Sequence, residues 1–333
     1  MRFYVQKLLF YVVALWAAIT LNFLIPRMMP GNPVDLLISR MSAGGLPVTP
    51  ETRRAIEIQL GGVGQGSLIH QYWLYLGSLI HGDLGLSISN YPAQVSSIIG
   101  QALPWTIGLI GTSAVIAFVL GITLGIFAGW KRGSILDNLI PVATLFQAVP
   151  YFWLALVLLL LFSRYLHWFP FAGGYDVLSN PTILIGFNWR FISSAIYHAF
   201  LPALTVIISS IAGWMLGMRN MMVSTLSEDY ILTAEAKGLT RNRIRMSYAA
   251  RNAILPSLSG FAITLGFVVG GSIVTEQVFS YPGIGYLMWS SVSNNDYPLM
   301  QGCFLVISLA VLAANLIVDL LLGFIDPRTR TAS

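Results

Sequence analysis

Six apolar runs alternate with polar segments along the chain, and each run is long enough to cross a hydrocarbon core of ~30 Å as a helix. We predict transmembrane helices over residues 8–25, 106–130, 139–162, 201–218, 257–274 and 302–323. Glycines at helical spacing in the second and fifth runs predict close helix packing, and Pro141 and Pro150 predict a kink in the third. The pattern predicts an all-α integral membrane protein.

The polar segments divide the chain into three parts. These are residues 1–30 with the first run, residues 31–100 as a long segment outside the membrane, and residues 101–333 as a core with the other runs. In the long segment, Thr49 and Pro50 predict the start of a helix, and Asp83 is typical of a turn. We expect residues 163–197, which contain tryptophan, proline and glycine, to form an irregular segment on the same side.

Residues 224–256 form a polar and basic segment that predicts two short helices. The Ser227 side chain can accept hydrogen bonds from the first free amides of a helix, and the acidic residues that follow suit the positive end of its dipole. That helix should end at Gly238, because glycine adopts the left-handed conformation without a steric penalty. Thr240 should cap a second, arginine-rich helix, and Pro256 marks the start of the next apolar run.

The composition and the placement of charge indicate a membrane protein and not a nucleic-acid-binding one. With 56% hydrophobic and 9% charged residues, the chain cannot be arranged as soluble globules, despite its net charge of +5. Of the 18 lysines and arginines, 12 lie in alternate polar segments, including both terminal ones and residues 219–251. Short cytoplasmic loops are rich in these residues, so both termini are predicted to be cytoplasmic. The single cysteine, Cys303, excludes an intrachain disulfide.

The sequence contains no signature of an ATP site or of an enzyme. Gly61 and Gly66 have the spacing of a phosphate-binding loop, but Ser67 follows where lysine is required. The four histidines, at positions 70, 81, 167 and 198, lie in predicted outer segments and lack the spacing of metal ligands. We therefore expect neither catalysis nor a cofactor or metal bound by this chain, and active transport would need an energy source on another chain.

Several stretches resemble the permease subunits of binding-protein-dependent ABC importers, and in particular the first permease of the dipeptide and oligopeptide branch. They are, in chain order, EDYILTAEAKGL, AARNAILP, TEQVFSYPGIG, NNDYPLMQG and DLLLGFIDPRTR. Leu232 stands where maltose-type permeases have a glutamate, and the 18 positions from Gly238 to Pro256 favour the peptide branch. The turn GGVGQGS replaces a charged turn that is more usual in the family.

The resemblance implies the type I ABC importer fold, with six transmembrane helices and both termini cytoplasmic, in the inner membrane of the cell. It implies three kinds of partner besides the lipid bilayer: a homologous second permease, two ATPase subunits, and an extracytoplasmic substrate-binding protein. ATP and Mg would be bound by the ATPase subunits and not by this chain. Residues 224–256 would be the coupling loop that contacts the ATPases. Small residues at 234, 236 and 238 would let the ATPase backbone approach this loop closely.

The resemblance assigns residues to the coupling role, and polar residues within the apolar runs suggest others. The ATPase-coupling residues are Glu228, Asp229, Tyr230, Ala234, Glu235, Ala236, Lys237, Gly238, Arg251 and Asn252. Polar residues that could line the translocation path are Gln147, Ser209, Ser210, Thr264 and Ser272, although each could equally form hydrogen bonds between helices. Asp319 is interpreted as an interface anchor that pairs with Arg328 or Arg330, and the alternative is a substrate or proton contact.

Three alternatives stay open at this point. The substrate could be a peptide, which we favour, an oligosaccharide such as cellobiose, or a nickel complex, because the family transports each of these. Residues 224–256 could be a solvated basic loop with no partner. The chain could also be a secondary transporter that works without ATPases, but that class needs a midplane ion site and usually paired broken helices, and the sequence has no clear inverted repeat.

Overall fold

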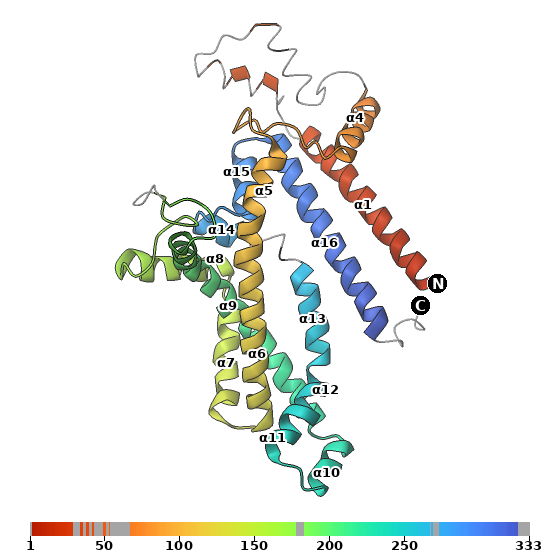
Figure 1. The fold of residues 1–333 in the computed structure, drawn as a ribbon, viewed down its shortest axis with the longest axis vertical. Coiled ribbons are helices and arrows are strands. Elements are labelled where there is room, and N and C mark those ends of the chain that lie inside the picture. Colours follow the sequence, from red (N-terminus) through yellow and green to blue (C-terminus); the bar gives the residue numbers. More distant parts are fainter. Residues whose placement is uncertain are drawn as a thin grey trace.

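The computed structural model describes residues 2–28, 34–35, 38–39, 42, 49–50, 53, 67–177, 183–266, 268 and 273–325. Over these residues the elements are helices, apart from an isolated antiparallel bridge between Leu86 and Gln94, and this confirms the all-α prediction there. Figure 1 shows long helices between two ends of the molecule. We call these the α10 end, after helix α10 (Asp229–Ala236), and the α15 end, after helix α15 (Ile284–Ser293).

Four described helices are long and apolar enough to cross a membrane. They include Gln6–Ile25 of α1 (Arg2–Met28), Val95–Trp130, α9 (Trp189–Thr225) and Tyr297–Ile317 of α16 (Tyr297–Ile325). The bent pair of residues 135–148 and 151–165 would add a fifth. Helix α13 (Leu255–Gly266) covers part of the predicted fifth run but is shorter, and residues 267 and 269–272 lie outside the described residues. The arrangement with six spans therefore stays a prediction.

The second span is longer than predicted, because it begins at Val95. It consists of α5 (Val95–Thr106), a π-helix η1 (Ile107–Gly111) and α6 (Thr112–Trp130). Three of its glycines, Gly121, Gly125 and Gly129, lie against α9, whereas Gly108 has no atom near its Cβ position. A Cβ at Gly125 would be 2.6 Å from the carbonyl oxygen of Met215, and one at Gly129 would be 2.5 Å from the Cβ of Met222. Any larger residue would force α6 and α9 apart, so the predicted close packing of this run is confirmed.

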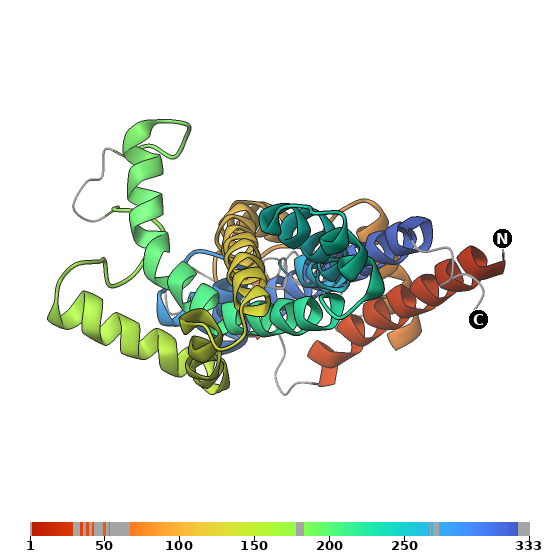
Figure 2. The ribbon, with the colours of Figure 1, turned by 90° about the horizontal axis from the view of Figure 1, so that it is seen from below.

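The predicted kink in the third run is also confirmed. Helix α7 (Ile135–Ala148) ends just before Pro150, and α8 (Tyr151–Leu158) with the π-helix η2 (Leu159–Tyr165) continues at 98° to it. In Figure 2, which looks from the α10 end, α8 (lime) and the first turns of α9 (green) project away from the other helices.

The irregular segment predicted over residues 163–197 is shorter than expected. Helix η2 continues to Tyr165, and α9 begins at Trp189. The start of α9 is fixed by its N-cap, since the Asn188 side chain accepts a hydrogen bond from the Phe191 amide at 2.9 Å. The fourth helix therefore begins directly after Asn188, well before the predicted apolar run.

At the α15 end, the first and last helices are attached to each other. Helices α1 and α16 lie side by side (Figure 1), and the Asn22 and Gln301 side chains each donate to the other residue's carbonyl oxygen, at 2.8 and 3.0 Å. Helix α4 (Leu68–Ile80) follows, and then the predicted turn, which is confirmed because Asp83 Oδ1 accepts from the Gly85 amide at 2.9 Å. Most of the helix predicted after Thr49 lies outside the described residues.

Candidate functional site

Residues 224–256 form the outermost part of the α10 end (Figure 1). Helix α9 ends at Thr225, α10 follows, and helical structure resumes with three short elements that lead into α13. These are α11 (Arg241–Arg243), the π-helix η3 (Ile244–Ala250) and α12 (Arg251–Ala253). The prediction of two helical pieces with a break between them is confirmed.

The start of α10 differs from the prediction. Ser227 does not cap the helix, because its hydroxyl donates to the carbonyl oxygen of Ser224 at 2.6 Å in the turn that closes α9. The N-cap is Glu228, which makes no capping bond with its side chain. Gly238 ends this piece with a φ of +71°, as predicted, and Thr240 is the N-cap of α11, although its side chain makes no capping bond.

The inner face of α10 is buried within this chain. Ile231 and Ala234, which lie on the same face of the helix, are each 2% exposed. They belong to an apolar cluster with residues of α6, α9 and η3, among them Ile126, Met222 and Ala249. We expected Ala234 to admit the backbone of a partner, but its small size serves packing inside the chain. The cluster fixes α10 onto the membrane helices.

The outer face of α10 is polar with an exposed apolar residue. Leu232 is 60% exposed and Tyr230 is 38% exposed. The other coupling residues that the sequence predicted, apart from Ala234, are also exposed; they are Glu228, Asp229, Glu235, Ala236, Lys237, Gly238, Arg251 and Asn252. From the sequence alone, Leu232 stood out only as a departure from the maltose-type permeases. Its position, out of phase with Ile231 and Ala234, was the signal that it points outward.

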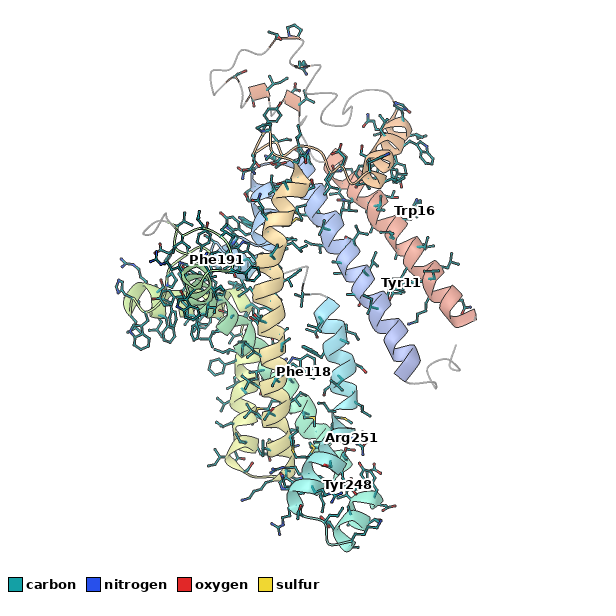
Figure 3. All side chains as sticks on the ribbon, in the orientation of Figure 1. Tyr11, Trp16, Phe118, Phe191, Tyr248 and Arg251 are labelled. Atoms are coloured by element: carbon teal, nitrogen blue, oxygen red, sulfur yellow. The ribbon has the colours of Figure 1, made fainter. Side chains whose placement is uncertain are left out.

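Two contacts attach the coupling residues to the helices behind them. The Asn252 side chain donates from Nδ2 to the Tyr230 hydroxyl and to the Tyr248 carbonyl oxygen, both at 3.0 Å, which joins α10 to α12 and η3. The Arg245 guanidinium lies 4.5 Å from the ring centroid of Phe127 on α6. Figure 3 places Tyr248 and Arg251 at the α10 end, with Phe118 further along α6. The sequence predicted Tyr230 and Asn252 but not their contact.

The described residues that were predicted to line a path lie on three helices, α7, α9 and α13. Ser209 and Thr264 donate their hydroxyl protons to carbonyl oxygens of their own helices, at 2.9 and 3.0 Å. Gln147 lies at the end of α7 beside Gly213 of α9. Gly213 follows Ser210 by one helical turn. Ser272 lies outside the described residues, and so do the side chain of Asp319 and the residues Arg328 and Arg330. Lining of a path by these residues stays a prediction.

Sequence reasoning missed a buried carboxylate at the α15 end. Glu276, in α14 (Ile273–Val278), is fully buried. Its Oε1 accepts from the Thr106 hydroxyl at 2.8 Å, and its Oε2 accepts from the amides of Gly285 and Tyr286 at 2.7 and 3.2 Å. The Thr106 oxygen in turn accepts from the Ile284 amide at 2.8 Å. Burial raises the pKa of the Glu276 carboxyl, and these hydrogen bonds oppose that rise.

A second buried carboxylate lies at the other end of α15. Asp296 accepts hydrogen bonds from the Ser87 hydroxyl at 2.5 Å and from the Leu299 amide at 3.2 Å. It also accepts from the amide of Ser89 at 2.8 Å and from the hydroxyl of the same residue. All of these donors are neutral, and they attach residues 87–89 to the start of α16. Among the described residues, no group of three or more His, Cys, Asp or Glu could hold a metal ion.

The chain matches the model of a protein family over residues 121–331, and that family is described as the inner membrane component of binding-protein-dependent transport systems. The chain belongs to this family. As a member with several long apolar helices, it is a multi-pass protein of the inner membrane. The matched residues include the whole of 224–256, so the site described here lies within the part that the family shares.

Three curated permeases are similar to this chain over nearly its whole length. The oligopeptide transport system permease protein AppB of Bacillus subtilis is 32% identical over 325 residues, which cover 97% of this chain and 98% of that protein. The dipeptide transport system permease protein DppB of Escherichia coli K12 is 32% identical over 343 residues, with 98% of each chain covered. The di/tripeptide transport system permease protein DppB of Pseudomonas aeruginosa is 31% identical, with 99% of each chain covered.

Proposed function

We propose that this chain is one permease subunit of an ATP-driven importer and forms half of the translocation path for peptides. The peptides would arrive on an extracytoplasmic binding protein, and the other half of the path would come from a homologous second permease. The observation that carries the proposal is the similarity to three permeases named for oligopeptides, dipeptides and di/tripeptides, which extends over nearly the whole of each chain. These names favour peptides over the oligosaccharide and nickel-complex alternatives.

The energy for transport would come from two separate ATPase subunits that bind ATP and Mg. Residues 224–256 would be the cytoplasmic coupling loop, and the outer face of α10, with Leu232 and Tyr230, would contact an ATPase. The geometry supports this role because the inner face of α10 is anchored to α6 and α9, so a displacement of α10 would move the membrane helices. The arrangement would have six spans, both termini in the cytoplasm, and α15 on the extracytoplasmic side.

The proposal is tested by purifying the chain from cells that also express the second permease and the ATPases of its transport system. We expect the ATPases to co-elute with this chain, and we expect Gly238→Trp to abolish co-elution because the bulky side chain would stand beside the docking face. Gly133→Trp is the matched control, since Gly133 has a φ of +75° against +71° for Gly238 and neither has atoms near its Cβ position.

Reconstituted complexes then distinguish the substrates and the transport classes. In proteoliposomes with the cognate binding protein, we expect ATP-dependent uptake of trialanine and no uptake of cellobiose. If cellobiose and not trialanine were taken up, the substrate class would be oligosaccharide and not peptide. Uptake by this chain without ATPases, unchanged in Gly238→Trp, would instead indicate a secondary transporter and would contradict the proposal.

A further inference from the structure

The Val95–Trp130 span is a continuous helical run that reaches from one end of the molecule toward the other. Thr106 lies near its α15 end and Trp130 lies at its α10 end, about 35 Å apart at 1.5 Å per residue. The π-helix η1 begins directly after Thr106. The Ser113 hydroxyl donates to the carbonyl oxygen of Leu109 in that turn at 2.6 Å, which keeps the run bonded across the irregularity.

At the α10 end, this helix is fixed to the proposed coupling loop. The contacts of Gly125 and Gly129 hold α6 against α9 without room for a methyl group, and α9 continues through residues 226–228 into α10. Phe127 of α6 lies under Arg245 of η3, and Ile126 shares the apolar cluster that buries Ile231 of α10. A displacement of α10 would therefore move α6 through packed side chains, both by way of α9, which precedes α10, and by way of η3, which follows it.

At the α15 end, the same helix is fixed to residues 273–293 by its last α-helical residues before the π-turn. Thr106 donates to Glu276 and accepts from the Ile284 amide, so one hydroxyl joins three elements. Trp105 adds an edge-to-face contact with Tyr281, with ring centroids 5.6 Å apart. The approach needs a glycine at position 283, where a Cβ would lie 2.3 Å from Glu276 Oε2 and 2.4 Å from Thr106 Oγ1.

We propose that Thr106 and Glu276 are positioning residues that make the Val95–Trp130 helix a rigid link between the coupling loop and residues 273–293. The inference rests on the proposed function, because it gives the helix a movement to transmit. A helix transmits a displacement only where both of its ends are attached. At the end remote from the ATPases, these two residues form the buried hydrogen-bonded attachment, beside the apolar packing of Val95 and Ile99 against α15 and α16.

The test compares Thr106→Val with Thr106→Ser in the complete complex in lipid nanodiscs. Valine keeps the shape but removes the hydroxyl, and it leaves Glu276 and the Ile284 amide without that partner, whereas serine keeps both bonds. We expect Thr106→Val to hydrolyse ATP at the wild-type basal rate, but its stimulation by the trialanine-loaded binding protein should be about five- to tenfold weaker than in wild type, because these buried hydrogen bonds are lost. Thr106→Ser should stay close to wild type.

A distance measurement separates transmission from a merely structural role. Gln101 on α5 and Val292 on α15 are both exposed, so spin labels on cysteines at these positions report whether α5 and α15 move together. We expect the distance between the two labels to be the same without nucleotide and with trapped ATP in wild type and Thr106→Ser. In Thr106→Val the distance should depend on nucleotide.

Each outcome decides a different point. A wild-type complex without ATP-dependent uptake contradicts the proposed function itself. Active wild type together with normal stimulation in Thr106→Val, or with equal losses of basal and stimulated hydrolysis, overturns only the inference about Thr106 and Glu276. If Thr106→Val does not assemble, the labelled wild type still decides: a distance between Gln101 and Val292 that changes with nucleotide shows that the two helices are not rigidly joined.

Discussion

The two ends of the molecule place their charged groups in opposite ways. At the α10 end, the charged side chains of α10 lie on the outside, and Ile231 and Ala234 fix the helix by apolar contacts. At the α15 end, Glu276 and Asp296 are both fully buried and held by neutral amides and hydroxyls. An exposed charge is available to a partner, whereas a buried carboxylate that accepts several hydrogen bonds fixes distant segments of its own chain to each other.

The difference is consistent with the proposed division of labour. The α10 end would be pressed by a separate ATPase, so it needs a polar outer face on a firm apolar base. The α15 end would respond to that movement as a unit, so it needs internal bonds between its segments. Four substitutions, each with a matched control, test this contrast.

Asp296→Ala should cause the largest loss of stability. The substitution leaves the buried Ser87 hydroxyl, the buried Leu299 amide and the part-buried Ser89 amide without an acceptor. At about 1–3 kcal/mol for each buried unsatisfied group the loss should be about 4 kcal/mol. Thermal unfolding of the purified complex measures it. The control is Asp83→Ala, which removes an exposed turn carboxylate from the same region and should cost less than about 1 kcal/mol. Similar losses in the two variants would mean that Asp296 does not hold residues 87–89 to α16.

Ile231→Ala should cost about 3 kcal/mol, because it leaves a cavity in the apolar cluster behind α10. Leu232→Ala, one residue further, should change stability by less than about 0.5 kcal/mol because that side chain is exposed. ATPase co-purification should show a different effect from stability: Leu232→Ala should weaken ATPase binding although the chain keeps its normal stability. If Leu232→Ala left ATPase binding unchanged, the outer face of α10 would not be the docking face.

The same contrast explains what the sequence could predict. Gly238 was predictable because one residue type in one context favours the left-handed conformation, and the break at Pro150 was predictable because proline lacks an amide proton. The apolar runs were predictable because a membrane needs long uninterrupted stretches. The start of α5 at Val95 was not, since it depends on packing of Val95 and Ile99 against the last helix and α15.

The buried carboxylates could not be located from local sequence. Nothing in TEQVFSYPGIG indicates that the carboxylate of Glu276 meets a hydroxyl 170 positions away, because burial of a charge depends on where the other helices lie. Ser227 illustrates the reverse error: its residue type fits a helix cap, but the turn at the end of α9 engages its hydroxyl first. Side-chain preference therefore predicts turns and caps only where tertiary contacts do not compete.

Gly238→Ala should cost about 1 kcal/mol, because a residue with a Cβ is strained at a φ of +71° although no atom lies near the added methyl group. ATPase co-purification should survive, in contrast to Gly238→Trp. The matched substitution at the other end, Gly77→Ala, lies within helix α4 and also meets no neighbouring atom, so it should stabilise the protein by about 0.5 kcal/mol. Shifts of the same sign in thermal unfolding would contradict the backbone explanation.

The smallest effect concerns the pH dependence of stability at Glu276. Its pKa in the folded chain is raised above the ordinary value by burial, so the folded state holds this proton more readily than the unfolded state does. The stability that protonation contributes is complete below the ordinary pKa and is lost as the pH rises through the folded-state pKa. The titratable neighbour Tyr281, whose pKa burial and the Glu276 charge both raise, stays protonated over this range.

Glu276→Gln isolates that contribution, because the amide keeps the shape of the side chain and can still donate to Thr106 Oγ1 while it accepts from the Gly285 amide. We expect the wild-type unfolding temperature to fall relative to that of Glu276→Gln as the pH is raised from about 5 to about 8, through this single group. Asp83→Asn, at an exposed carboxylate, should give a difference that does not vary over the same range. If the difference for Glu276→Gln were equally flat, water would reach the carboxylate, and the buried attachment on which the contrast between the two ends depends would not exist.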